Sequence, residues 1–402
     1  MKSLVFFFCF ALCLQLDAQC DGSRFRTSTF TGVSISENII YSQVTPAGLR
    51  MDVYEPTGDV SSARPLIIMA HGGSFIAGDE NSEDIVAICN AFAKRGYVTA
   101  SIQYRLTDSS NLYDSLYMMK TVINATQDMR AAVRYFRKDA ATINSFKIDT
   151  SMIFIGGASA GAISALHTGI LTEQTELPSY IQNIVNTEGG LEGNSGSPGY
   201  SSNVAGIINL CGALNRAEWI SSTSVPIVSI HGTQDGTVPF GHGEVLASSV
   251  GVFANLITVD GSSPIHNRAQ SLNVKNQLWA IEGADHMAHT LPQYQQQAET
   301  FVSDFLYTIV CPNSSIDEIL DVSSEVNVYP NPTRDILNID MTKTQFKAGD
   351  ELYFYDVFGH VALQGRIDSK FVTINTDTAN GIYQLVIKGE NITAVKNVVV
   401  GK

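Results

Sequence analysis

Three side chains that together could transfer an acyl group follow one another along the chain as serine, aspartate and histidine. Ser159 stands in "GGASAGA", where Gly157, Ser159 and Gly161 form the pattern G-x-S-x-G. A serine hydroxyl is a weak nucleophile at neutral pH, so it needs a histidine as base and a carboxylate that orients the histidine. The pattern lies between an apolar run and a helical run, where a sharp turn would lift the serine above a sheet edge. We therefore predict that Ser159 is a nucleophile.

The carboxylate and the base are expected after Ser159, each just past the end of a strand. Asp235 follows the apolar run "VPIVSIHG", and His286 follows "QLWAIEG". Both positions match this order, so we predict that Asp235 is the acid and His286 the base. The competing residues are Asp260 and Asp285 for the acid, His289 for the base and, more weakly, His231, His242 and His266.

The stretch "HGGSFIAGD", residues 71–79, follows the apolar run "PLIIMA" and could stabilise an oxygen anion. Negative charge develops on a carbonyl oxygen under nucleophilic attack, and backbone N–H groups aimed at that oxygen stabilise the charge. Paired glycines let the backbone approach closely. We predict that the N–H groups of Gly72, Gly73 and Ala160 are these donors. His71 is expected to shape the loop through hydrogen bonds and not to act as a base.

Composition and missing motifs exclude several other classes of function. The chain has a net charge of −14, whereas a nucleic-acid partner needs clustered positive charge. The sequence contains no G-x-x-x-x-G-K-[ST], no H-E-x-x-H, no cluster of cysteines and histidines, and no G-x-G-x-x-G after its first strand. We therefore expect no cofactor, no metal and no nucleic-acid partner. The 402 residues, 44 % of them apolar, suffice for two globular domains.

These residues need a scaffold, and strand-like and helix-like segments alternate from residue 39 to residue 310. Strands are expected at 39–44, 49–56, 65–73, 97–106, 151–159, 204–214, 225–235 and 277–286, and helices at 83–96, 121–143, 160–171 and 291–310. Such alternation predicts a mostly parallel sheet covered on both faces, with the working site at the carboxyl ends of the strands. The Gly- and Ser-rich residues 186–203 form either a loop over the site or a surface insertion.

The two ends of the chain differ from this middle part. Residues 1–18 combine one lysine with an apolar stretch and a small residue, Ala18, which predicts a signal peptide. From residue 326 to residue 402, short strands separated by turn residues predict a small all-β sandwich. We assign residues 19–312 to a catalytic domain and residues 313–325 to a linker. No later segment reaches the length of a transmembrane helix.

The cysteines offer a further constraint, because an exported protein matures where disulfides persist. Removal of the signal peptide leaves Cys20, Cys89, Cys211 and Cys311, which allow three pairings. A bond between Cys20 and Cys311 would tie both ends of the catalytic domain together. Cys89 and Cys211 stand in apolar contexts that suit buried thiols.

Several stretches together carry a family resemblance. The set "HGGSFIAGD", "SIQYRL", "GGASAGA", "HGTQDGTVP" and "EGADH" resembles α/β-hydrolase carboxylesterases with an HGG oxyanion loop, including hormone-sensitive-lipase-like esterases and bacterial feruloyl or acetyl-xylan esterases. The resemblance covers residues 35–310 and implies an α/β-hydrolase fold with the same site residues as derived above. Two departures are "HGGS" in place of the commoner three glycines and Ala158 where many members carry an acid.

The tail carries a second resemblance. Its stretches "VYPNPTRDILNI", "YDVFGH", "NGIYQLVI" and "VVVGK" are similar to the C-terminal sorting domain, type A, of the type IX secretion system of Bacteroidota. The resemblance implies export through the periplasm to the exterior or the cell surface. A carbohydrate-binding sandwich would instead need exposed aromatic residues, but Tyr329, Tyr353, Tyr355 and Tyr383 alternate as core residues of a sheet would.

The two resemblances together imply a secreted serine carboxylesterase that works through an acyl-enzyme. Its substrate is expected to be a small-molecule or polysaccharide-linked ester, such as an acetyl or feruloyl ester of plant polysaccharide. Its expected partner is the type IX secretion machinery. The alternatives are a serine peptidase on the same fold and a non-catalytic surface protein that binds carbohydrate.

Overall fold

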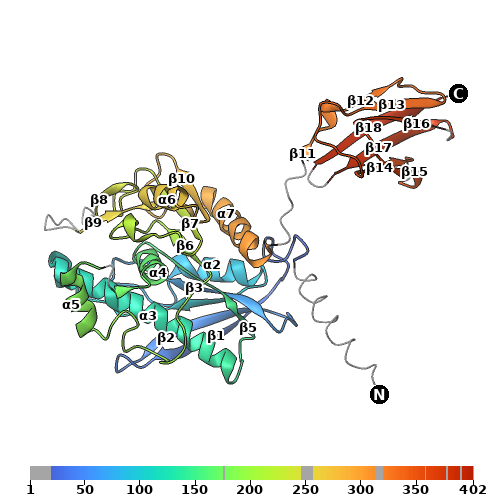
Figure 1. The fold of residues 1–402 in the computed structure, drawn as a ribbon. Helices are drawn as coiled ribbons and strands as arrows, with labels where there is room; N and C mark the ends of the chain where they lie inside the picture. The colour runs from blue at the N-terminus through green and yellow to red at the C-terminus, as the bar shows by residue number, and fades with distance from the viewer. Residues whose placement is uncertain are drawn as a thin grey trace, which may run out of the picture. The chain divides into compact units, whose positions relative to one another are not determined.

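The computed structural model describes residues 20–401 except 175–176, 246–256, 313–319, 358, 377–378 and 390–391. The chain divides into two compact units, Met1–Ser314 and Ser315–Lys402 (Figure 1). The predicted signal peptide, residues 1–18, lies outside the described residues.

Eight strands among the described residues of the first unit form one sheet (Figure 1). The pairings of β1 with β2 and of β2 with β4 are antiparallel, and every later pairing is parallel. In their order across the sheet, the strands are β1 (Val33–Ser42), β2 (Leu49–Pro56), β4 (Val98–Ile102), β3 (Arg64–Ala70), β5 (Ile148–Ala158), β6 (Gly206–Leu210), β7 (Ile227–Gly232) and β10 (Asn276–Ile281).

Helices cover both faces of this sheet. They are α2 (Glu83–Ala93), α3 (Ser115–Ala141), α4 (Ala160–Ile170), α5 (Ser179–Thr187), α6 (Ser262–Ser271) and α7 (Pro292–Val310). Residues of α3, α4, α5 and α6 pack into the core on one face, and residues of α2 and α7 pack into the core on the other. The mostly parallel, doubly covered sheet confirms the predicted fold class.

The central strands are buried on both faces, which explains their continuous apolar runs. On β3, Leu66 and Ile68 belong to one core, and Ile67 and Met69 belong to the other. Successive residues of a strand point to opposite faces, so the two cores take alternate side chains. All four side chains are fully buried.

Helix α3 begins two turns earlier than the predicted start at residue 121. The carboxylate of Asp114 accepts hydrogen bonds from the N–H groups of Leu116 and Tyr117, at 2.9 and 3.3 Å. This is the arrangement of a helix N-cap, which satisfies donors that have no partner inside the helix. The additional residues, Ser115 to Lys120, include several that line the cavity beside Ser159.

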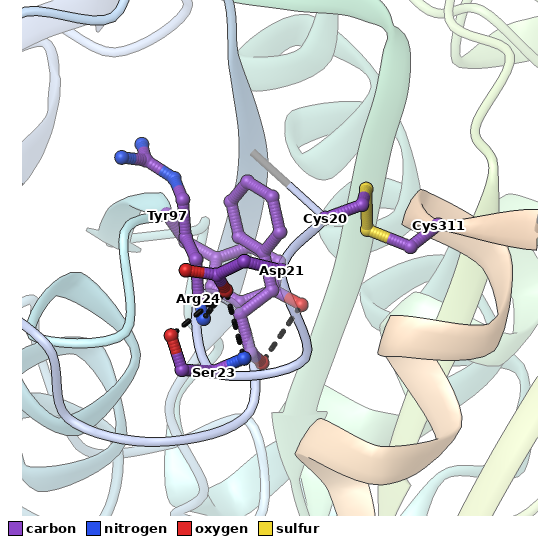
Figure 2. The surroundings of a disulfide bond; sticks show 7 residues. Cys20, Asp21, Ser23, Arg24, Tyr97 and Cys311 are labelled. Atoms are coloured by element: carbon purple, nitrogen blue, oxygen red, sulfur yellow. Dashed lines mark hydrogen bonds between the residues drawn. A yellow bond between two sulfur atoms is a disulfide. The ribbon is translucent and has the colours of Figure 1, made fainter. Parts of the chain in front are cut away.

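A disulfide bond joins Cys20 to Cys311, with their Cα atoms 5.7 Å apart (Figure 2). Among the pairings that the sequence left open, this is the one that ties the ends of the catalytic domain together. Just after Cys20, the carboxylate of Asp21 accepts hydrogen bonds from the N–H groups of Ser23 and Arg24, which fixes the turn (Figure 2). Cys89 and Cys211 are buried free thiols.

The second unit is a β-sandwich among its described residues. One sheet has the order β11 (Leu320–Asp321), β18 (Ile392–Val400), β17 (Gly381–Lys388), β14 (Glu351–Tyr355) and β15 (Val361–Arg366), and the other has β12 (Asn327–Tyr329), β13 (Ile336–Asp340) and β16 (Phe371–Asn375). Residues 320–325, which we assigned to the linker, contribute β11 and the core residue Val322.

The tyrosines of this sandwich do not all lie in its core, contrary to our expectation. Tyr383 is buried, but Tyr329 is 45 % exposed. On β14, Leu352 and Phe354 point inward, so the alternation of a strand turns Tyr353 and Tyr355 to the opposite face. Their two rings stack there, 5.8 Å apart.

No helix formed by the described residues has the length and apolar character needed to cross a membrane.

Candidate active site

Ser159 occupies a sharp turn between β5 and α4. Its backbone has φ 52° and ψ −117°, a conformation that costs energy for a residue with a side chain. The turn tolerates no bulk around it. A Cβ atom at Gly161 would lie 2.0 Å from the carbonyl oxygen of Ala70, and one at Gly157 would lie 2.4 Å from the carbonyl carbon of Gly161. The strand–turn–helix context that we predicted for the G-x-S-x-G pattern is present.

The structure brings the three predicted residues of the triad together. The Oγ atom of Ser159 lies 2.9 Å from Nε2 of His286, and Nδ1 of His286 lies 2.6 Å from Oδ2 of Asp235. Asp235 follows the end of β7 and His286 follows the end of β10, and these strands are parallel neighbours. An ionised carboxylate can only accept from Nδ1, so Nδ1 carries the proton, and in the neutral ring Nε2 can accept from the serine hydroxyl.

Burial and hydrogen bonding shift the pKa values of Asp235 and His286 in opposite directions. Burial raises the pKa of Asp235, but the hydrogen bonds from His231 and His286 outweigh it and hold that pKa well below its usual value. Burial lowers the pKa of His286, but its hydrogen bonds and charge interactions with Asp235 and Cys211 together outweigh burial, so the pKa of His286 is raised. The Asp235 side chain is fully buried and ionised, which suits a group that must stabilise an imidazolium.

Asp235 has a second imidazole partner that the sequence did not reveal. Nε2 of His231 lies 3.1 Å from Oδ2 of Asp235, and its Nδ1 lies 2.8 Å from the hydroxyl of Ser262. The other oxygen of Asp235 accepts from the N–H groups of Thr237 and Val238, both at 2.8 Å. His231 ends a buried strand, and we expected it only to pack or bond locally. The buried strand end was the available signal, but nothing in the sequence shows which carboxylate the ring would meet.

Cys211, which we interpreted as an ordinary buried thiol, lies against His286, the predicted base. It follows β6, has a φ of 50° and is 1 % exposed. Its Sγ atom, a carboxylate oxygen of Asp235 and a ring nitrogen of His286 lie within 4.8 Å of one another. Among the described residues these are the ones placed to hold a metal ion such as zinc. An ion there would displace the hydrogen bond between Asp235 and His286.

The competing residues have other partners. His289 is buried, and its interaction is with Cys211. Asp260 accepts from the N–H of Ala217 at 2.7 Å and pairs with His242. Asp285 accepts from the N–H groups of Gly236 and His286, at 2.9 and 2.7 Å. The last two bonds fix the backbone around the triad, so Asp285 positions the loop that carries His286.

The glycine loop after β3 lies beside Ser159, but it is not arranged quite as we predicted. The N–H of Gly72 donates to Oδ2 of Asp84 at 2.9 Å, so this donor is not available to an oxyanion. Within the described residues, the N–H groups of Gly73 and Ala160 have no such acceptor. Gly73 has a φ of 106°, and a Cβ atom there would lie 2.2 Å from the carbonyl oxygen of Ala77. Glycine is therefore required by the turn itself.

His71 and Tyr104 support the same loop. Nδ1 of His71 lies 2.6 Å from the carbonyl oxygen of Gly72, so the ring hydrogen-bonds within the loop as we expected. The ring of Tyr104 stacks on that of His71, 4.3 Å away, and its hydroxyl donates to the His71 carbonyl at 2.9 Å. Asp84 and Tyr104 were not recognised from the sequence, because their partners are backbone groups.

A cavity of about 180 Å³ opens beside Ser159 and Ala160. Side chains of α3, α4 and α5 form a large part of its wall, and most of the lining side chains are apolar. An apolar cavity with a few polar groups at one end is the common form of a small-molecule site.

Two parts of the chain match known families. Residues 51–215 match the family model described as BD-FAE, and residues 327–401 match the model described as secretion system C-terminal sorting domain. No match was found among curated proteins.

Solved structures of one esterase share the fold of the first unit. The apo form of Thermogutta terrifontis esterase 2 is 20 % identical with a TM-score of 0.51, and the match covers 70 % of this chain and 96 % of that chain. The propionate-bound form is 19 % identical with a TM-score of 0.50, over 69 % and 95 % of the two chains. At this identity the likeness establishes the α/β-hydrolase fold alone.

Proposed function

This chain joins a BD-FAE esterase domain of the α/β-hydrolase fold to a secretion system C-terminal sorting domain, and from that premise we propose that it is a secreted serine carboxylesterase. The observation that carries the proposal is the continuous hydrogen-bonded line from Asp235 through His286 to Ser159. The sorting domain implies secretion or export to the cell surface, and the type IX secretion machinery is the partner that it would engage.

The proposed reaction has two steps with the same acid–base partner. Ser159 Oγ attacks the ester carbonyl carbon, and its proton passes to Nε2 of His286. The imidazolium, stabilised by Asp235, then gives this proton to the leaving alcohol as the ester C–O bond breaks. In the second step a water loses a proton to His286 and attacks the acyl-enzyme. Ser159 leaves with the returned proton and the carboxylic acid is released.

The oxyanion of each tetrahedral intermediate would be held by backbone N–H groups. We propose the N–H groups of Gly73 and Ala160, which flank Ser159 from the glycine loop and from the start of α4. Loss of one such donor typically reduces kcat 10²- to 10³-fold. Asp84 would act as a positioning residue, because it fixes the loop through Gly72.

The predicted substrates, acetyl or feruloyl esters of plant polysaccharide, follow from the family resemblance and from export. A substrate outside the cell suits an enzyme with a sorting domain. The preferred acyl and alcohol groups are therefore the part of the proposal that an ester panel must decide.

The test is hydrolysis of p-nitrophenyl acetate, butyrate and octanoate, methyl ferulate and acetylated xylan by the wild type and by Ser159→Ala. We expect turnover by the wild type, loss of turnover in Ser159→Ala, and labelling by a fluorophosphonate probe only when Ser159 is present. Ser303→Ala, which removes a buried hydroxyl from α7, is the matched control and should behave as the wild type. Full activity of Ser159→Ala would refute the mechanism. Labelling without any ester turnover would favour a peptidase, and neither labelling nor turnover would favour a binding protein.

A further inference from the structure

Regularly spaced side chains of three helices form part of the wall of the cavity beside Ser159. On α4 the lining residues are Ala160, Ile163 and His167, followed by Leu171 just past the helix. They recur every three or four positions and so lie on one face of the helix. α3 contributes a stripe of the same spacing, which includes Met118 and Val122, and α5 contributes Ile181 and Val185. The cavity therefore begins at the nucleophile and runs along α4.

Two polar side chains of this wall, those of Thr126 and His167, already have partners within the protein. The hydroxyl of Thr126 donates to the carbonyl of Val122 at 2.8 Å. Nδ1 of His167 lies 2.7 Å from the carbonyl of Ile163, and its Nε2 accepts from the N–H of Asn215 at 3.3 Å. Burial lowers the pKa of His167 to about 4, against a smaller opposing effect of the bond to Ile163, so the ring is neutral at neutral pH. This stretch of wall thus offers a ligand apolar contact and no charge.

The Gly- and Ser-rich segment contributes Leu191 to the wall of the cavity. It is held in place from α3. Glu192 forms ion pairs with Arg130 and Arg134, whose side chains are only 6 % and 4 % exposed. Arg130 also donates to the carbonyl of Thr168 at 3.2 Å, near the end of α4. Of the two alternatives for residues 186–203, a loop over the site and a surface insertion, the contact of Leu191 with the cavity favours the first, and the loop is held in place.

A second set of bonds holds the same segment. The side-chain amide of Gln127 donates to the carbonyls of Glu188 and Gly190, at 3.0 and 2.8 Å. These two carbonyls precede Leu191 in the chain, and Glu192 follows it. The chain on either side of Leu191 is therefore held by side chains of α3.

We propose that this cavity binds the acyl group of the substrate, that the group is an unsubstituted chain of about six to eight carbon atoms, and that the clamp formed by Glu192, Arg130 and Arg134 sets this limit. The inference rests on the proposed esterase function. The volume of about 180 Å³ is slightly larger than the roughly 150 Å³ of an apolar cavity that binds benzene. An acetyl group would leave most of the apolar wall unoccupied.

A feruloyl group meets a different obstacle in the same cavity. Its ring carries a hydroxyl and a methoxy group, and burying polar groups without hydrogen-bond partners weakens binding. The polar atoms of Thr126 and His167 are already engaged, so they would have to release their own partners first. A plain aliphatic chain requires no such exchange.

The first test is the dependence of kcat/KM on acyl length, measured with p-nitrophenyl acetate, butyrate, hexanoate, octanoate and dodecanoate beside methyl ferulate. Each added methylene should raise kcat/KM about fourfold up to hexanoate or octanoate, with a fall at dodecanoate and lower values for ferulate. A maximum at acetate, or a maximum at ferulate, would overturn the inference and leave the esterase function intact. No turnover of any ester would refute the proposed function and the inference with it.

The second test changes the wall. Leu191→Trp should reduce kcat/KM for hexanoate at least tenfold more than for acetate, because the larger ring occupies the space of the longer chain. Ile143→Trp, at a position that is 81 % exposed, is the matched control and should leave the ratio unchanged. Glu192→Gln should release the clamp and move the maximum toward dodecanoate. An unchanged ratio in Leu191→Trp, or an unchanged profile in Glu192→Gln, would overturn the assignment.

A binding measurement covers the case in which these variants do not fold. Hexanoate and octanoate anions should raise the melting temperature of Ser159→Ala at millimolar concentration, and acetate should raise it much less. Equal effects of the three anions would contradict the proposed acyl site without any reference to turnover.

Discussion

Two pairs of aspartate and histidine stand at the active-site end of the first unit, and their hydrogen bonds have almost the same length. His286 lies 2.6 Å from Asp235, and His242 lies 2.7 Å from Asp260. His242 and Asp260 are cross-strand neighbours of the short strands β8 (His242–Glu244) and β9 (Thr258–Asp260). Asp235 and His286 follow the ends of the parallel strands β7 and β10, and a third strand, β5, supplies Ser159.

The difference between the pairs lies in what surrounds each of them. The side chain of His286 is 18 % exposed and faces the Ser159 hydroxyl, whereas that of His242 is 70 % exposed. A hydrogen bond in a buried, preorganised site is stronger than one open to water. The comparison teaches that the bond between the carboxylate and the imidazole does not by itself make a base. Burial of the carboxylate and a hydroxyl within reach of the second nitrogen are also needed.

The largest expected effect is the difference in kcat between variants of the two histidines. His286→Gln should lower kcat at least 10⁴-fold, since the nucleophile loses its base, as in other triads of this kind. His242→Gln should change kcat less than threefold. The measurement is steady-state hydrolysis of p-nitrophenyl butyrate by both variants. A comparable loss in both would mean that the second pair takes part in the reaction, and a small loss in His286→Gln would mean that this ring is not the base.

The next effect separates the two aspartates. Asp235→Asn should lower kcat about 10³- to 10⁴-fold, because His286 loses the group that orients it and stabilises its cation. It should also move the acid limb of the kcat/KM profile to lower pH. The direction follows from the raised pKa of His286. The base works only when it is neutral, so activity is lost as the pH falls through that pKa. Removal of the nearby negative charge lowers the pKa of His286 and moves the acid limb with it.

Asp260→Asn is the matched control for this change. It should leave the pH profile and kcat within threefold of the wild type, since Asp260 does not contact His286. It should instead lower the free energy of unfolding by about 1 kcal/mol. The two carboxylate oxygens of Asp260 bond to Ala217 and His242, and an amide has only one oxygen that can accept, so one of the two hydrogen bonds is lost. Thermal unfolding checks the second point. An acid limb that moves in Asp260→Asn would show electrostatic coupling between the pairs.

Much of this site could be predicted because it depends on the order of three residues along the chain and on their positions just after the ends of strands. Parallel strands bring their carboxyl ends to one edge, so Ser159, Asp235 and His286 could be placed from the apolar runs before them. The same pattern could not place Asp84 or His231. Their partners, the Gly72 amide and the Asp235 carboxylate, are near in the sequence, but the turns that bring each pair together leave no periodic pattern of apolar residues.

The fold, too, has features that the sequence predicts and features that it does not. The sheet and its helices follow from the alternation of apolar runs. The disulfide was only one of the pairings that four cysteines allow, because the spacing of cysteines does not show which of them meet. The first turns of α3 were missed because their start depends on one capping carboxylate, Asp114, and not on apolar spacing. The sequence did not show which tyrosines of β14 and β17 point into the core. Alternation along a strand assigns residues to two faces, but it does not show which face packs against the other sheet.

The smallest expected effect concerns the thiol beside the triad. Burial raises the pKa of Cys211, but its interactions with His286 and His289 outweigh burial and lower it. The same interaction supports the charged form of His286. Cys211→Ala should therefore move the acid limb of kcat/KM to lower pH, in the same direction as Asp235→Asn but by less, with kcat on the plateau within about threefold of the wild type.

Cys89→Ala provides the comparison, because Cys89 is an equally buried free thiol in α2 whose pKa burial raises to about 12. Its removal creates a similar small cavity without changing the charges around His286, so its acid limb should coincide with that of the wild type. If both variants shifted the limb equally, the shift would report a loss of packing. If neither did, Cys211 would be a neutral neighbour of His286, and the raised pKa of that ring would rest on Asp235 alone.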